Sequence, residues 1–212
     1  MAVDALLLQS AAPAATLGGA VASAARDAGI RRASVTTHAA IEGPDAYAYL
    51  WSDTPIPVAA AHSISRALTA MVSRDASPFV VLVLRRLNEL PGASAQEPAP
   101  FHYVVETRVD AINEVDFNTW YDTEHLPGLS AVPGCVCARR LCTLDARPTY
   151  VACYDLVVPD VLSSEAWLAV RRTPWSSRVR PTFRDTKRTM FRTTSRSALD
   201  RAPAETRAAR TS

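Results

Sequence analysis

The sequence predicts an α+β fold in which two successive βαββαβ units close into one barrel. Three observations lead to this prediction. The chain has 212 residues, of which 48% are hydrophobic and 21% charged, so it can bury one large core or two small ones. Strand-like and helix-like segments occur twice in the same order. A stretch of linker composition at residues 91–100, without hydrophobic periodicity, separates the two series.

The elements of the first unit, residues 1–90, follow from local patterns. Runs of β-branched, apolar or alternating residues indicate strands, and apolar residues at helical spacing indicate helices. Pro13 suits the start of a helix, and Gly29 suits the position after its end. The predicted strands are Val3–Gln9, Arg31–Ala40, Ala46–Trp51 and Phe79–Leu84, and the predicted helices are Ala14–Ala28 and Val58–Met71.

The second unit, residues 101–194, repeats this order. Pro133-Gly134 opens its second strand, and Pro174 interrupts its second helix. The predicted strands are Phe101–Thr107, Cys135–Leu144, Thr149–Leu156 and Lys187–Thr193, and the predicted helices are Asn113–Leu126 and a segment from Pro159 into the 170s. Residues 195–212 contain few large apolar side chains, which predicts a flexible tail or an arm laid on a neighbour.

A βαββαβ unit is a ferredoxin-like motif, and its helices cover only one face of its sheet. The other face must be buried, and the second unit is the obvious cover. The sequence therefore predicts a pseudo-dimeric α/β barrel within one chain. The alternative is a side-by-side arrangement in which another chain covers each open face. A homodimer remains open in either case.

Composition excludes several classes of function. The formal net charge of +2 gives no basic face for nucleic acid, and the Leu6–Leu8 run is too short for a signal or membrane segment. We therefore expect a cytoplasmic protein without nucleic-acid or membrane partners. The four cysteines lack zinc-site spacing and the four histidines fall on four elements, so we expect no metal site.

The densest chemistry lies in Trp120–Pro127. Leu126 precedes a proline, so the helix should end there and leave His125 in its last turn. Free carbonyls at that end should help His125 to hold a proton, unless burial opposes it. Helical spacing also predicts that Tyr121, Asp122 and His125 share one face.

The stretch Phe117–Pro127, followed by Val132-Pro133-Gly134 and by Ala138-Arg139-Arg140, resembles the EthD-like branch of the dimeric α/β-barrel superfamily. The resemblance covers residues 101–192. It implies that His125 lies at a substrate pocket. The position in the first unit that matches His125 is Ala20, so the first unit is expected to be a degenerate copy and the pocket to lie on the second.

Each candidate residue has a functional and a structural interpretation. As general acid or base, His125 would move a proton, with Asp122 or Glu124 setting its tautomer, or it could simply cap the helix. Tyr121 and Trp120 could line the pocket or pack the helix on its sheet. Further substrate-binding candidates are Arg139, Tyr154 and His102, and His38 could reach into a shared barrel from the first unit; a surface salt bridge is the common alternative for Arg139.

The preferred hypothesis is a cofactor-independent enzyme of the lyase or isomerase type. In it, His125 catalyses isomerisation, elimination or cyclisation of a small aromatic, lactone or polyketide-like carbonyl compound. The alternatives are a cofactor-free monooxygenase, a haem protein with His125, His102 or His38 as ligand, and a module that binds a small ligand without transforming it.

Overall fold

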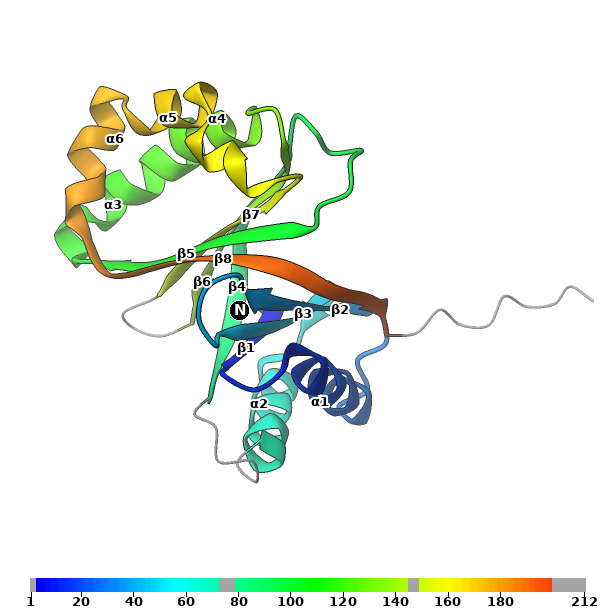
Figure 1. Cartoon of the computed structure of the whole chain (residues 1–212). Coiled ribbons are helices and arrows are strands. Elements are labelled where there is room, and N and C mark those ends of the chain that lie inside the picture. The colour runs from blue at the N-terminus through cyan, green and yellow to red at the C-terminus, as the bar shows by residue number, and fades with distance from the viewer. Residues whose placement is uncertain (1–2, 73–78, 145–148, 200–212) are drawn as a thin grey trace, which may run out of the picture.

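The computed structural model describes residues 3–72, 79–144 and 149–199, whose eight strands form a closed antiparallel barrel (Figure 1). The strands are β1 (Val3–Ser10), β2 (Ala33–Ala40), β3 (Ala46–Ile56), β4 (Phe79–Pro91), β5 (Phe101–Val109), β6 (Cys135–Thr143), β7 (Tyr150–Leu156) and β8 (Phe183–Ala198). The helices are α1 (Ala14–Asp27), α2 (Val58–Val72), α3 (Ala111–Trp120), α4 (Leu126–Ser130), α5 (Glu165–Arg171) and α6 (Pro174–Val179). Shorter helical turns occupy Tyr121–His125, Pro159–Ser163 and Arg180–Thr182.

The two halves of the chain contribute neighbouring arcs of the barrel. The first half has the order β4-β1-β3-β2 and the second has β8-β5-β7-β6, so the positions correspond. The arcs join where β2 pairs with β8 and where β4 pairs with β6. The α+β barrel prediction is therefore confirmed, and the side-by-side arrangement is wrong. Figure 1 shows α1 and α2 on one side of the barrel and α3 to α6 on the opposite side.

Strand alternation divides the buried side chains between the barrel lumen and the two helix layers. On β7, Val151 and Cys153 belong to the lumen cluster, while Tyr150 and Tyr154 belong to the cluster beneath α3 to α6. A third cluster lies between α1, α2 and the first-half strands. The two faces of the second-half sheet therefore border different interiors, and this decides which candidate residues can meet.

Barrel closure lengthens the strands beyond their apolar runs. Strand β4 continues to Pro91 because its far half pairs with β6, and β8 continues to Ala198 because it pairs with β2. The predicted tail thus begins inside a strand, and residues 200–212 lie outside the described residues. The predicted linker is also anchored: Gly92 N–H donates to Val136 O at 2.9 Å, and a Cβ at Gly92 would stand 2.0 Å from Cys135 O.

Candidate functional site

The helix that begins at Ala111 does not stop before Pro127. An α-helix here would direct the proline ring against the Thr123 carbonyl and would lack one hydrogen bond. The chain instead widens into a π-helical turn at Tyr121–His125, where Leu126 N–H bonds to Tyr121 O, and helix α4 then contains Pro127. The predicted helix end at Leu126 is therefore wrong, and His125 lies in the middle of a continuous helical segment. Single π-turns of this kind are frequent at functional sites.

The π-turn decides what His125 touches. Residues five apart in an α-helix point about 140° away from each other, but the wider turn brings Trp120 and His125 onto one face. Their rings stack with centroids 4.0 Å apart and an interplanar angle of 23°. The Tyr121 ring meets the imidazole edge-on at 5.1 Å. His125 is 7% exposed, and its Nδ1 has no hydrogen-bond partner among the described residues.

Neither predicted carboxylate orients His125. Asp122 is half exposed and pairs with Arg140 at 3.2 Å, and Glu124 accepts hydrogen bonds from Trp120 Nε1 at 3.2 Å and Thr173 Oγ1 at 2.6 Å. Both carboxylates therefore fix the helix against its surroundings. Of the predicted trio, Tyr121 meets His125, whereas Asp122 points toward the sheet beside Arg140.

Burial opposes protonation of His125, which is the exception that the sequence left open. Burial, first, and the positive charges of Arg180, Arg171 and Arg140 together lower the pKa of His125 to about 3. The helix end that should have favoured the cation does not exist at this position. His125 is consequently a neutral imidazole near neutral pH.

This shift predicts a specific pH dependence of stability. Between the ordinary pKa of 6.5 and the folded pKa of about 3, the unfolded chain protonates His125 and the folded protein does not. Stability contributed by His125 is thus fully present above pH 6.5 and falls by up to about 1.4 kcal/mol per pH unit below it. Urea unfolding of wild type and His125→Gln between pH 7.5 and 4.5 measures this. The variant should show a shallower loss toward acid, and equal slopes would contradict a buried neutral imidazole.

His125 borders a small cavity between the second-half sheet and its helices. The cavity has a volume of about 30 Å³, enough for water. Its wall is mostly aromatic and is formed by Tyr103, Trp120, Tyr121, Tyr154, Trp167 and Phe183, with Val105, Leu129 and His125 completing it. The hydroxyl of Tyr154 is buried and, like His125 Nδ1, has no partner among the described residues. Two polar groups with unused hydrogen-bonding capacity thus line one aromatic cavity, which we call the His125 pocket.

Three arginines complete the lining of the His125 pocket: Arg171 on α5, Arg180 in the following helical turn and Arg188 on β8. None of them forms an ion pair with a carboxylate in the described part of the chain, and Arg180 donates only to the Arg171 carbonyl at 3.4 Å. Burial lowers the pKa of Arg180, and the neighbouring charges of Arg171 and Arg188 lower it further. Sequence inspection missed all three, because they come from three separate elements.

Arg139 and Arg140 point to opposite faces of β6, as their adjacency predicts. Arg140 lies beneath α3, is 1% exposed, and places its guanidinium over the rings of Tyr121 at 4.4 Å and Tyr150 at 5.0 Å. Arg139 points into the lumen and bonds Asp155 at 2.8 Å and Glu89 at 3.0 Å. The pair of Arg139 with Asp155 is buried, so the surface salt bridge considered for Arg139 is not what the structure shows there.

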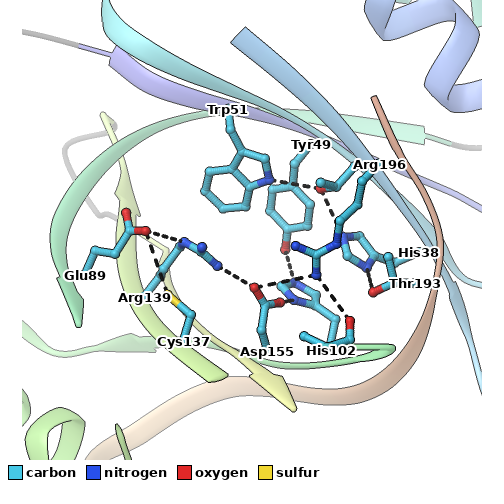
Figure 2. A network of polar contacts seen from close by, with 12 residues as sticks. His38, Tyr49, Trp51, Glu89, His102, Cys137, Arg139, Asp155, Thr193 and Arg196 are labelled. Atoms are coloured by element: carbon cyan, nitrogen blue, oxygen red, sulfur yellow. Dashed lines mark hydrogen bonds and ion pairs between the residues drawn. The ribbon is translucent and has the colours of Figure 1, made fainter. Parts of the chain in front are cut away.

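A second polar cluster lies at one end of the barrel lumen (Figure 2). A chain of contacts runs from Glu89 through Arg139 and Asp155 to His102, whose Nδ1 lies 2.8 Å from Asp155 and whose Nε2 lies 3.4 Å from the Tyr49 hydroxyl. Burial alone would raise the pKa of Asp155, but His102 and Arg139 together hold it well below its usual range. We call this set the lumen network.

His38 joins the lumen network from the first half of the chain, as considered from the sequence. Its ring stacks on His102 with centroids 4.2 Å apart, and its two nitrogens contact the hydroxyls of Thr36 and Thr193 at 3.1 and 3.2 Å. Burial lowers the pKa of His38, and the charge of His102 adds to this effect. The network borders a polar cavity of about 180 Å³ that includes Trp51, Arg86 and Arg196.

The predicted site residues therefore separate into two groups. Trp120, Tyr121, His125 and Tyr154 meet at the His125 pocket, whereas His102, His38 and Arg139 meet in the lumen. His102 and Tyr154, both named as substrate-binding candidates, do not share a cavity, because the two residues lie on opposite faces of the sheet. Asp155 was missed, although a carboxylate in the otherwise uncharged strand Tyr150–Leu156 was a usable signal.

The side chains of the lumen network largely satisfy one another, although Arg86 Nε is buried there without a partner among the described residues. Among the described residues, the His125 pocket instead combines two buried polar atoms without a hydrogen-bond partner with three arginines without a carboxylate partner. Within the described ranges, no group of three histidine, cysteine or carboxylate side chains could hold a metal ion. None of the helices in these ranges is long and apolar enough to cross a membrane.

Comparison with solved structures shows the same fold at low sequence identity. An anthrone oxidase-like protein matches with a TM-score of 0.62 and 13% identity, covering 95% of this chain and 96% of the other. A ferredoxin-fold protein of Listeria monocytogenes, related to antibiotic biosynthesis monooxygenases, matches with a TM-score of 0.56 and 8% identity over 92% and 96%. A haem-degrading enzyme from Listeria monocytogenes matches with a TM-score of 0.54 and 9% identity over 89% and 98%. No family model and no curated protein matches the chain. The chain is therefore similar in fold to ferredoxin-like barrel proteins.

Proposed function

We propose that this protein is a cofactor-independent enzyme that uses His125 as a general base on a small, partly apolar carbonyl compound. The observation that carries the proposal is the neutral, buried imidazole with an unpartnered Nδ1 in an aromatic cavity. The resemblance of Phe117–Pro127 to EthD-like proteins points to the same residue. The aromatic wall favours a flat substrate such as an aromatic ketone or a lactone.

The residues of the His125 pocket suit proton transfer. His125 would take a proton from the carbon beside the carbonyl, and the C–H electron pair would delocalise onto the carbonyl oxygen as an enolate. Burial raises the pKa of Tyr154 well above its ordinary value, so its hydroxyl stays protonated and can donate a hydrogen bond to that oxygen. Return of the proton to another carbon completes an isomerisation. Loss of a leaving group completes an elimination, and attack of the enolate carbon on a second carbonyl completes a cyclisation.

Haem does not fit the His125 pocket. A cavity of about 30 Å³ holds water, and a porphyrin would require the helix layer to separate from the sheet. A small substrate requires a smaller rearrangement of the pocket than haem does. Arg188 is exposed and Arg171 and Arg180 are half-buried, so rotation of their side chains can enlarge the pocket.

The corresponding strand orders of the two halves support a further part of the proposal: the chain is a tandem, pseudo-dimeric barrel with one working pocket. Helix α1 occupies the place in the first half that α3 occupies in the second. Its buried positions are small or aliphatic, and counting along the sequence matches His125 with Ala20. The first half then serves as structural partner to the second.

The test is proton exchange followed by product formation. Aromatic ketones, lactones and short polyketide-like diketones are incubated with the protein in D2O, and NMR records loss of the proton beside the carbonyl. Exchange and product without oxygen consumption are expected. Product formed only with stoichiometric oxygen uptake would instead identify a cofactor-free monooxygenase, which the aromatic pocket also suits. Tight binding with neither exchange nor product would identify a binding module.

A further inference from the structure

We infer that the ligand of the His125 pocket carries a negatively charged oxygen group, a carboxylate or a phosphate, on an apolar body, and that Arg171, Arg180 and Arg188 bind this group. The inference rests on the pocket of the proposed function. It adds the charge of the substrate, which neither the fold nor the aromatic wall specifies.

The first support is the uncompensated positive charge. Three arginines close to the pocket arginines in the sequence pair with carboxylates: Arg172 with Glu165 and Arg178 with Asp116 on the helix layer, and Arg184 with Asp110 on β8. The three pocket arginines have none among the described residues. Like charges brought together in partly buried positions raise the free energy of the folded protein. An anion bound beside the three arginines lowers this free energy again.

The second support is geometric. A guanidinium presents a planar fork of donors that matches a carboxylate or a phosphate, and three such groups, half-buried or exposed, line one pocket. The same pocket is lined by the buried Trp120, Trp167 and Tyr154, and the Tyr154 hydroxyl has no partner among the described residues. A ligand with a charged end and a flat apolar end therefore has a place for each end.

The third support links charge to chemistry. Arg180 and Arg171 are the two largest charged contributors to the lowered pKa of His125, after burial. An anion bound to these arginines offsets their field, so the pKa of His125 rises when the ligand enters. The imidazole then becomes a stronger base only in the complex, when the substrate is present.

The experiment compares matched probes by isothermal titration calorimetry at low ionic strength. Benzoate should bind at least about tenfold more tightly than benzamide, its neutral isostere. Arg180→Gln and Arg188→Gln should each reduce this preference, and the double variant should abolish it. Arg184→Gln, on the same strand as Arg188 but paired with Asp110, is the matched control and should keep it. Comparison of the dissociation constants of phenyl phosphate and benzoate shows whether the pocket prefers a phosphate or a carboxylate.

Several outcomes would overturn the inference. Equal binding of benzoate and benzamide would show that the pocket does not select a negatively charged ligand. A preference for benzoate that survives the double variant would show that Arg180 and Arg188 do not cause it. If inorganic phosphate bound as tightly as phenyl phosphate, the apolar part of the ligand would not contribute to binding, and that part of the inference would be wrong. NMR titration of the His125 ring should show a higher pKa with benzoate than with benzamide. The preference for benzoate over benzamide is measured independently of turnover. If His125→Gln stays active while the Arg180→Gln/Arg188→Gln variant loses this preference, the proposed function is wrong and the inference about the anion holds.

Discussion

Replacing His125 by Gln is expected to lower turnover of the proton-transfer reaction by about 10²- to 10⁴-fold, the usual contribution of a positioned general base. Glutamine keeps the side chain polar and of similar length, so the stack on Trp120 is weakened without opening a large cavity. Substrate binding should change much less, because the aromatic wall and the arginines remain. The measurement is kcat and KM for the substrate that exchanges its proton in D2O.

The matched control for this variant is His62→Gln, which changes an exposed histidine on α2, on the opposite side of the barrel. It should leave both constants unchanged. The kcat/KM of the wild-type protein, which reports the free enzyme, should be level from pH 8 to pH 5, since the imidazole of the free folded protein protonates only near its pKa of about 3. If the kcat of His125→Gln stayed within a few fold of the wild-type value, His125 would not be the general base.

Replacing Asp155 by Ala is expected to reduce the free energy of unfolding by roughly 3–5 kcal/mol, the cost of removing one partner from a buried ion pair. Asp155 is 4% exposed and accepts from both His102 and Arg139 at 2.8 Å. Without it, His102 and Arg139 lose a shared acceptor inside the barrel. The measurement is urea unfolding at pH 7 followed by circular dichroism.

Two further variants interpret this result. Asp155→Asn keeps one acceptor but removes the charge, so its loss should be smaller than that of Asp155→Ala. Asp116→Ala removes an exposed carboxylate that also serves two donors, Trp175 and Arg178, and should change stability little because solvent screens the pair. If Asp155→Ala and Asp116→Ala proved equally mild, the lumen network would not stabilise the barrel.

The strand and helix order was predictable because each element carries its own periodicity. The Phe79–Leu84 run and the alternation at Ala46–Trp51 identify strands without reference to the rest of the chain. Their full lengths were not predictable, because β4 and β8 extend only where a strand of the other half pairs with them. Local pattern determines where a strand is, and tertiary pairing determines how far it continues.

The candidate site was predictable as a stretch but not as a geometry. Spacing rules for an α-helix place Asp122 near His125, yet the π-turn moved Trp120 into that position. A widened turn depends on how the helix packs on its sheet, which the proline alone does not reveal. The cluster of Arg171, Arg180 and Arg188 and the lumen network could not be predicted from the sequence for a related reason. Their members meet only once the barrel has closed.

The closing ladders have a consequence for the order in which the chain acquires its structure. Strand β8, the last element described, pairs with β5 of its own half and with β2 of the first half. The first half, synthesised earlier, therefore keeps the edge of β4 uncovered until β6 emerges and the edge of β2 uncovered until β8 emerges. Such long-range pairing folds slowly, and the waiting intermediate exposes surface that favours aggregation. We therefore expect this protein to depend on chaperones during synthesis more than its modest size suggests.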